Sequence, residues 1–287
     1  MLFAFSPVLQ AQSVGSQRDH HQVIIIGAGM AGISAARYLN SKGIKDIVIL
    51  EARSRLGGRV WSYRPKYKAW KNNVLDLGAI YLHKARTNPL MKWVKRGSIK
   101  TVIMDWEDDV LYFADGRLVS NKEGRRIDRL YKQFQRYLAY RQEEDSIHSK
   151  QSVSDALVTF IRRKKLSRHS QAGLLYMVST YVENEYAADM TRLSLVWFDN
   201  DSEFSGPERV FPDGYVQLID HLAKPVVGQI LFNQVVSKIN YRKRGAVVVT
   251  THHGRRFTAP YVICTVPIGV LQRKRIDFLP ALPRNKQ

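Results

Sequence analysis

The sequence predicts an α/β fold, in which a domain built around a parallel β-sheet is divided into two chain segments by a mainly helical insert. Three observations predict it. A short apolar run at 23–26 leads into a glycine-rich turn, a helical pattern and a second apolar run. After residue 207 the chain returns to short β-branched runs separated by hairpin turns. Between these parts, residues 121–145 and 170–186 carry apolar side chains at helical spacing.

The first apolar run and its turn have the pattern of a strand followed by a ligand-binding loop. Val23–Ile26 is apolar and β-branched throughout, which is typical of a parallel strand buried on both faces. Three glycines in the turn permit a sharp bend, a close approach of phosphate to the backbone, and tight packing of the next helix. The N–H groups at the helix start then face the phosphates. The turn consists of Gly27, Ala28, Gly29, Met30, Ala31 and Gly32.

An acidic residue completes this unit. Glu51 follows the second apolar run, Ile47–Leu50, and lies 19 residues after Gly32. A carboxylate at this place accepts hydrogen bonds from the hydroxyls of an adenosine ribose. A glycine turn that serves packing alone leaves the position of the acid unexplained. The strand, turn, helix and acid together predict a Rossmann-like domain that binds a dinucleotide.

The residues after Glu51 indicate which dinucleotide. They read EARSRLGGR, which resembles the E-A-x-x-R-x-G-G-R signature of the flavin-containing amine oxidases, a family that includes monoamine oxidases, polyamine oxidases and lysine-specific histone demethylases. The resemblance implies FAD as the cofactor, contacted by Ala52, Arg53, Arg55, Gly57, Gly58 and Arg59. Read from the residues alone, the two glycines open the backbone and the arginines offer charge-assisted donors to phosphate. A basic turn with solvated arginines is the alternative.

Three further segments resemble the same family. Residues 76–84 are similar to the segment D/E-x-G-A-x-W-x-H-G, with Tyr81 in place of Trp and Lys84 in place of Gly. In relatives this segment passes under the flavin and lines the substrate cavity. The strand around Val236 and the sequence TVPIGVL match the family segments that contact the adenine and the flavin. The resemblance therefore implies cofactor contacts at Gly78, Ala79, Ile80, Val236, Thr265 and Pro267.

The substrate cavity is expected to contain Ile80, Tyr81, His83, Glu183 and Glu185. His83 is the candidate catalytic residue, because the matching histidine of polyamine oxidases lines the cavity and positions the substrate. A half-buried histidine satisfied by the backbone is the alternative. The two glutamates lie in an acidic stretch similar to one that faces the channel in some relatives, where a carboxylate binds the distal ammonium of a polyamine. A solvated helix end is the alternative there.

These assignments divide the chain into an FAD-binding domain at 22–85 and 207–287, a helical substrate-binding insert at 86–206, and a leader at 1–21. The resemblance implies oxidation of an amine, most of all a polyamine, with O2 as the acceptor and H2O2 as the product. It covers only the first part of the family pattern. We therefore expect the chain alone not to oxidise amines at an ordinary turnover of ~1 s⁻¹. A non-catalytic FAD-binding protein is the alternative.

The net charge of +20 is spread over scattered basic clusters. A solvated basic surface is the favoured interpretation, and a nucleic-acid or chromatin partner is the alternative. No apolar run reaches the ~20 residues that span a membrane, and no metal site is expected. The apolar stretch 2–9 has some features of a secretory signal, so the compartment stays open between cytoplasmic and secreted.

Overall fold

The computed structural model describes residues 19–70, 72–104, 110–113, 115–144, 149–199 and 204–286. The chain forms two compact units. The first combines Met1–Met104 with Phe204–Gln287, and the second is Asp105–Glu203. The apolar stretch 2–9 and most of the expected leader lie outside the described residues.

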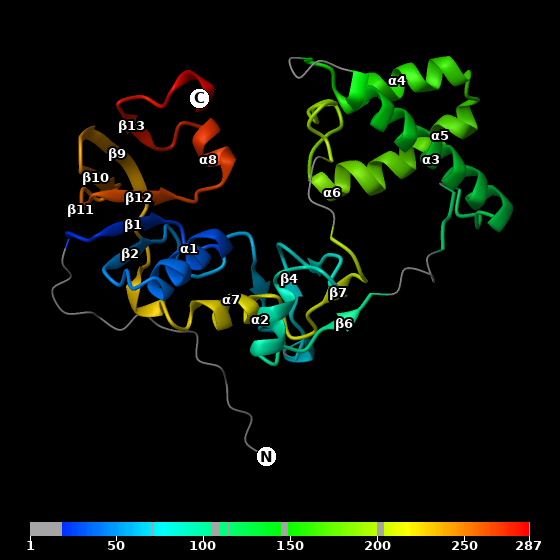
Figure 1. Ribbon diagram of the computed structural model, residues 1–287. Helices are drawn as coiled ribbons and strands as arrows, with labels where there is room; N and C mark the ends of the chain where they lie inside the picture. The colour runs from blue at the N-terminus through cyan, green and yellow to red at the C-terminus, as the bar shows by residue number, and fades with distance from the viewer. Residues whose placement is uncertain are drawn as a thin grey trace. The chain divides into compact units, whose positions relative to one another are not determined.

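A parallel four-stranded sheet forms the centre of the first unit (Figure 1). Its order is β12-β1-β2-β8, and Val23 lies opposite both Ile47 and Tyr261. Every residue of β1 and β2 is buried, as expected for apolar strands covered on both faces. The strands are β1 Val23–Ile26, β2 Ile47–Leu50, β8 Ile230–Leu231 and β12 Tyr261–Cys264.

The two faces of this sheet pack against different partners, because alternate side chains of a strand point to opposite faces. Ile25 and Ile49 join one apolar cluster with residues of α1 (Met30–Ser41) and α7 (Val216–Ala223). Ile24 joins a second cluster with residues of a separate antiparallel layer. Figure 1 shows the helices and that layer on opposite sides of the sheet.

The second layer has the strand order β11-β10-β9-β13. Its neighbours pair antiparallel except β9 and β13, which pair parallel. Helix α8 (Ile268–Gln272) and a 3₁₀ turn at Arg284–Lys286 flank β13. The strands are β9 Val236–Lys243, β10 Ala246–Thr251, β11 Arg256–Ala259 and β13 Asp277–Leu279.

Residues 19–21 are part of this layer rather than of a leader, which corrects the predicted boundary at residue 22. His20 bridges to Thr258 of β11, and the Thr258 N–H donates to the carbonyl of Asp19 over 2.7 Å. The Asp19 carboxylate also lies 2.8 Å from the Arg255 guanidinium. Backbone pairing and an ion pair therefore extend the first unit to at least residue 19.

Two small sheets complete the first unit. One pairs β3 (Ser62–Tyr63) with β4 (Leu75–Asp76), and the other has the order β5-β7-β6. The members of the latter are β5 Tyr81–Leu82, β6 Val102–Ile103 and β7 Arg209–Val210. Helix α2 (Met91–Arg96) and 3₁₀ turns at Lys68–Trp70 and Val227–Gln229 accompany them.

The structure moves the insert boundaries from the predicted 86–206. Residues 86–104 and 204–206 belong to the first unit. The physical reason is that α2 contacts α7 and that β6 pairs antiparallel with β7, which ties this stretch to the sheet.

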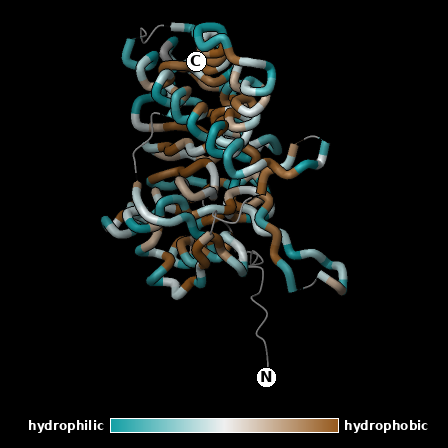
Figure 2. The backbone as a smooth tube through the Cα atoms, turned by 90° about the vertical axis from the view of Figure 1, so that its right-hand side faces the viewer, coloured by the Kyte–Doolittle hydropathy of each residue, from teal (hydrophilic) through white to brown (hydrophobic). Residues whose placement is uncertain are grey.

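The second unit is helical, and its helices pack around one apolar cluster. Along α3 the buried residues Tyr131, Phe134 and Leu138 recur every three or four positions, which places them on one face. Figure 2, coloured by hydropathy, shows hydrophobic and hydrophilic stretches alternating along the coiled parts of the backbone. A capping box of Ser152 and Asp155 starts α4. The elements are α3 Asn121–Glu144, α4 Val153–Lys164, α5 Arg168–Val178, a π-helical turn Ser179–Glu183 and α6 Asn184–Tyr186. Among the described residues, no helix is both long and apolar enough to cross a membrane.

Candidate cofactor and substrate site

Three of the candidate cofactor residues lie at the carboxyl ends of the parallel strands. Gly27 follows β1, Glu51 follows β2, and Thr265 follows β12. The Thr265 hydroxyl donates to the carbonyl of Ile26 over 2.8 Å and so joins two of these strand ends. In open parallel sheets this edge is where ligands bind.

The three glycines of the turn differ in what a side chain at each position would meet. Gly27 has φ +104°, a conformation that favours glycine. A Cβ on Gly32 would lie 1.9 Å from the carbonyl oxygen of Gly27, so the helix packs against the turn only without a side chain there. A Cβ on Gly29 would meet no protein atom closer than 3.9 Å. Protein packing therefore requires Gly27 and Gly32, whereas the space beside Gly29 is free for a ligand.

The start of α1 offers backbone donors at the same place. Gly29 is the N-cap residue and makes no side-chain cap, and the first turn, which includes Met30 and Ala31, contains no acidic residue. The first N–H groups of a helix lack partners within the helix and carry a partial positive charge. A diphosphate fits this position by charge and by hydrogen bonding.

Glu51 is held beside the turn. Its Oε2 accepts the N–H of Ala28 over 2.7 Å, and its Oε1 accepts the N–H of Arg53 over 2.9 Å. The residue is only 6% exposed, and its own N–H donates to the carbonyl of Leu231 over 2.9 Å. A carboxylate oxygen can accept two hydrogen bonds. Each oxygen of Glu51 can therefore still accept one from a ribose hydroxyl. The position of Glu51 and its remaining capacity to accept hydrogen bonds therefore fit the adenosine half of a dinucleotide.

The basic segment after Glu51 folds back onto the glycine turn. Gly57 forms a β-bridge with Gly29, and its N–H donates to the carbonyl of Ala28 over 3.0 Å. Gly57 and Gly58 have φ of +95° and +57°. The exposed Ala52 begins this segment, which brings a second glycine-rich backbone alongside the open space at Gly29.

The arginines of this segment differ in their contacts. Arg55 donates to the carbonyls of Leu56 and Gly58 at 2.9 Å each, so its guanidinium braces the turn. Burial lowers the pKa of Arg55, and the charge of Arg53 adds to this effect. Arg59 is exposed and makes no side-chain hydrogen bond to the described part of the chain. Phosphate binding by Arg55 and Arg59 stays a prediction. Of the two, Arg59 is the one whose guanidinium makes no hydrogen bond to the described residues.

The predicted flavin segment runs along Arg59. The Ala79 N–H donates to the carbonyl of Arg59 over 3.2 Å, and a Cβ on Gly78 would lie 1.9 Å from that oxygen. Ile80, the next residue, is 42% exposed. Val236 is buried as the first residue of β9, and Pro267 precedes α8.

A carboxylate anchors this segment to α7. Both oxygens of Asp76 accept the N–H of Tyr215 at 3.2 Å, at the start of that helix. Ser62 donates to Asp76 and accepts the N–H of Val216 over 3.0 Å. Burial, together with the charge of Asp76, raises the pKa of Tyr215 to about 12.

His83 is paired with a carboxylate that the sequence analysis missed. Its Nδ1 lies 2.9 Å from Oε2 of Glu208, and the other oxygen of Glu208 accepts the N–H of Lys84 over 3.3 Å. The His83 side chain is 51% exposed and that of Glu208 only 24%. The ring of Tyr81 lies 5.8 Å from the imidazole. Glu208 directly precedes β7, and the pairing of β7 with β5 brings it opposite His83.

The two predicted cavity glutamates lie in the second unit. Glu183 ends the π-helical turn, and its Oε1 accepts the N–H of Met190 over 3.0 Å. Glu185 lies on α6. A cavity that unites these residues with His83 of the first unit stays a prediction. Within the residues described, no group of three or more His, Cys, Asp or Glu side chains is placed to hold a metal ion.

The chain is similar in sequence and in fold to several known proteins. The chain is 30% identical over 277 residues to probable polyamine oxidase 4 of Arabidopsis thaliana, covering 92% of the chain and 54% of that protein. It is 29% identical over 289 residues to lysine-specific histone demethylase 1 homolog 2 of the same plant, covering 99% and 38%. The solved structure of putrescine oxidase bound to putrescine matches with a TM-score of 0.69 at 19% identity, covering 93% of this chain and 62% of that one.

The chain thus spans about half or less of the length of these curated relatives. The family model for flavin containing amine oxidoreductases matches residues 30–287. The cofactor of this family is a flavin, FAD. With nearly the whole sequence matched and the fold shared, the chain belongs to the flavin-containing amine oxidoreductase family.

Proposed function

We propose that this chain provides the FAD-binding part of an oxidase that acts on amines, with polyamines as substrates and O2 as the electron acceptor. The carboxylate of Glu51, fixed 2.7 Å from the Ala28 N–H beside the open space at Gly29, is the observation that carries the cofactor part. FAD bound there supplies the acceptor for the hydride that leaves the carbon beside the amine nitrogen.

The residues of the first unit have distinct roles in this proposal. Gly29 and the start of α1 hold the diphosphate, and Glu51 holds the ribose. The backbone at Val236 contacts the adenine. Arg59 adds a charge-assisted donor to phosphate.

The polyamine part rests on His83 and its carboxylate. Nδ1 of the imidazole lies 2.9 Å from Oε2 of the Glu208 carboxylate, which orients the ring. An imidazole oriented in this way at the cavity positions a substrate amine and moves a proton to or from it. Two relatives are named for their action on polyamine and on putrescine, which supports this substrate class. Glu183 and Glu185 are proposed to bind the distal ammonium.

The cofactor part is tested by titrating the purified chain with FAD and with NADH and following protein fluorescence. Saturable binding of FAD that is at least about tenfold tighter than that of NADH is expected. Tighter binding of NADH would contradict the proposal.

The substrate part is tested by loading the chain with FAD, excluding oxygen and following the flavin absorbance after adding an amine. In this single turnover, which we expect to be slower than the ~1 s⁻¹ of ordinary enzyme turnover, spermine and spermidine should bleach the flavin faster than benzylamine does. Faster bleaching by benzylamine contradicts the polyamine assignment. FAD binding without bleaching by any of these amines favours a non-catalytic flavin-binding protein instead.

A further inference from the structure

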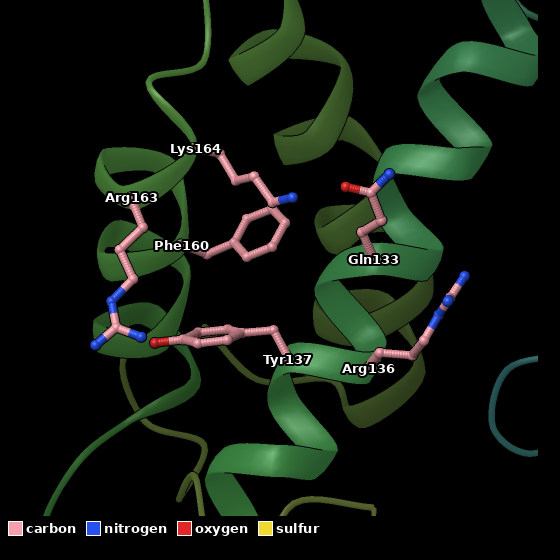
Figure 3. Close-up of a pocket in the computed structure, with 6 residues that line it drawn as sticks. All are labelled: Gln133, Arg136, Tyr137, Phe160, Arg163 and Lys164. Atoms are coloured by element: carbon pink, nitrogen blue, oxygen red, sulfur yellow. The ribbon is translucent and has the colours of Figure 1, made fainter.

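The second unit contains a groove that the cofactor site does not use (Figure 3). Its volume is about 700 Å³, and it lies between α3 and α4. Each helix contributes residues at positions i, i+3 and i+4, which share one helix face. They are Gln133, Arg136 and Tyr137 from α3, and Phe160, Arg163 and Lys164 from α4.

The floor of the groove is aromatic and fixed. Phe160 is only 3% exposed, and its ring lies 5.5 Å from that of Tyr137 and 5.4 Å from that of Phe134. These residues belong to the apolar cluster of the second unit. The floor is therefore part of the core and does not need to rearrange to receive a ligand.

The rim of the groove is positively charged. Arg136, Arg163 and Lys164 are exposed, and none of them forms an ion pair with a residue that the structure describes. One turn earlier on α3, by contrast, Lys132 pairs with Asp128 at 2.8 Å. Figure 3 shows Lys164 and Gln133 extending toward each other over the ring of Phe160, from opposite helices. An ammonium and an amide thus face the same space.

We propose that this groove binds an acidic segment of another polypeptide. Carboxylates of such a segment pair with the three cations of the rim, and the amide of Gln133 donates to a carboxylate or to the backbone of the segment. Short apolar side chains of the segment cover the edge of the aromatic floor. This inference is independent of the proposed oxidase function.

The geometry favours a peptide over a small ligand or a nucleic acid. Four of the six lining residues are exposed, so the groove is open, whereas small-molecule sites enclose most of the ligand. Single-stranded nucleic acids stack their bases on exposed aromatic faces. Here the guanidinium groups of Arg141 and Arg163 each lie 5.9 Å from the Tyr137 ring, and Phe160 is buried. No open aromatic face is left in the groove for a base.

The test measures fluorescence anisotropy with the full chain and a fluorescein-labelled peptide of three Glu-Leu-Glu-Ala repeats. The groove variant combines Arg136→Glu, Arg163→Glu and Lys164→Glu. The control combines Arg242→Glu, Lys243→Glu and Arg244→Glu, three exposed residues at the β9–β10 turn of the first unit. Both variants change the net charge equally. A difference in peptide binding between them therefore reports on the groove and not on the overall positive charge. Circular dichroism verifies that both are folded.

The groove variant is expected to bind the acidic peptide at least about tenfold more weakly than the native chain, and the control within about threefold of it. A peptide with Gln in place of every Glu should bind about tenfold more weakly to the native chain. Equal losses in the two variants would overturn the proposal, because nonspecific attraction then explains the binding. Tighter binding of a single-stranded oligonucleotide or of phosphatidylserine vesicles than of the acidic peptide would also overturn it.

Discussion

The N–H of Ala28 donates to Oε2 of Glu51 over 2.7 Å, which links the glycine turn after β1 to the end of β2. Because Oε1 accepts a second backbone N–H, from Arg53, the carboxylate cannot turn away from the turn without losing a bond. The acid is thus oriented before any cofactor binds, and orientation in advance lowers the entropic cost of binding.

Replacing this carboxylate should weaken FAD binding. Glu51→Ala removes about two ribose hydrogen bonds of ~1 kcal/mol or somewhat more each, so the Kd for FAD should rise on the order of ten- to a hundredfold. Asp46→Ala is the matched control, because this acid directly precedes β2 at the opposite end of the strand. Isothermal titration measures both. An unchanged Kd in Glu51→Ala, or an equal rise in the control, contradicts the role of Glu51.

Two glycine variants separate packing from ligand binding. Gly29→Ala should fold normally, since its Cβ meets no protein atom closer than 3.9 Å, but should weaken FAD binding at least about tenfold. Gly32→Ala should be unstable, because its Cβ would lie 1.9 Å from the carbonyl oxygen of Gly27. Thermal unfolding and FAD titration are compared. If both variants lose stability alike, the space beside Gly29 is not reserved for a ligand.

Asp76 should stabilise the first unit by capping α7. Asp76→Ala leaves the Tyr215 N–H and the Ser62 hydroxyl without this acceptor, and a lost cap costs about 1 kcal/mol. Urea unfolding should therefore show a lower free energy of unfolding. Asp213→Ala, an exposed acid just before the same helix, is the control and should change it by less than about 0.5 kcal/mol. An Asp76→Ala variant as stable as the control would exclude the cap.

Alkaline pH should destabilise the protein through two tyrosines. Burial raises the pKa of Tyr131 and of Tyr215 to about 12, from the ordinary value of 10.0. A pKa raised by folding means that the folded state holds the proton more tightly. The stabilisation is therefore complete below pH 10 and is lost as the pH rises toward 12. Urea unfolding between pH 9 and 12 should show a smaller decline in Tyr131→Phe and Tyr215→Phe than in the native chain.

The control for these variants is Tyr67→Phe, because Tyr67 is 81% exposed. Its decline with pH should match that of the native chain. If the free energy of unfolding declines equally with pH in the native chain and in all three variants, the two buried tyrosines do not contribute to the alkaline destabilisation.

Glu208 should act on catalysis through His83. Glu208→Gln removes the negative charge that lies 2.9 Å from the imidazole, so bleaching of the flavin by spermidine should slow on the order of tenfold. The Kd for FAD should stay within about twofold, since Glu208 lies outside the glycine turn. Asp213→Asn is the matched control. An unchanged bleaching rate in Glu208→Gln would leave the pair with a structural role alone.

The parts of the site that sequence analysis predicted are local in the chain. The turn after β1 and the acid after β2 belong to one strand–helix–strand unit, so spacing alone brings Gly29 and Glu51 together. The pairing of Glu208 with His83 depends instead on strands of two residues, β5 and β7, that are far apart in sequence. Strands of two residues are too short to show an alternation of apolar and polar residues in the sequence. The contacts of Arg55 with its own turn were missed for a different reason. A signature gives residue types but not where a long side chain ends.

The pairing of β6 with β7 has a consequence for how this protein tolerates change. Val102 lies opposite Val210, so the chain leaves the first unit and re-enters it at adjacent positions of one antiparallel ladder. A connection between such neighbours can lengthen greatly at a modest entropic penalty, because loop closure depends only logarithmically on length. Insertions and deletions between β6 and β7 therefore leave the register in which these two strands pair unchanged. Evolution and protein engineering can exchange residues 105–203 as a cassette while the nucleotide-binding framework is preserved.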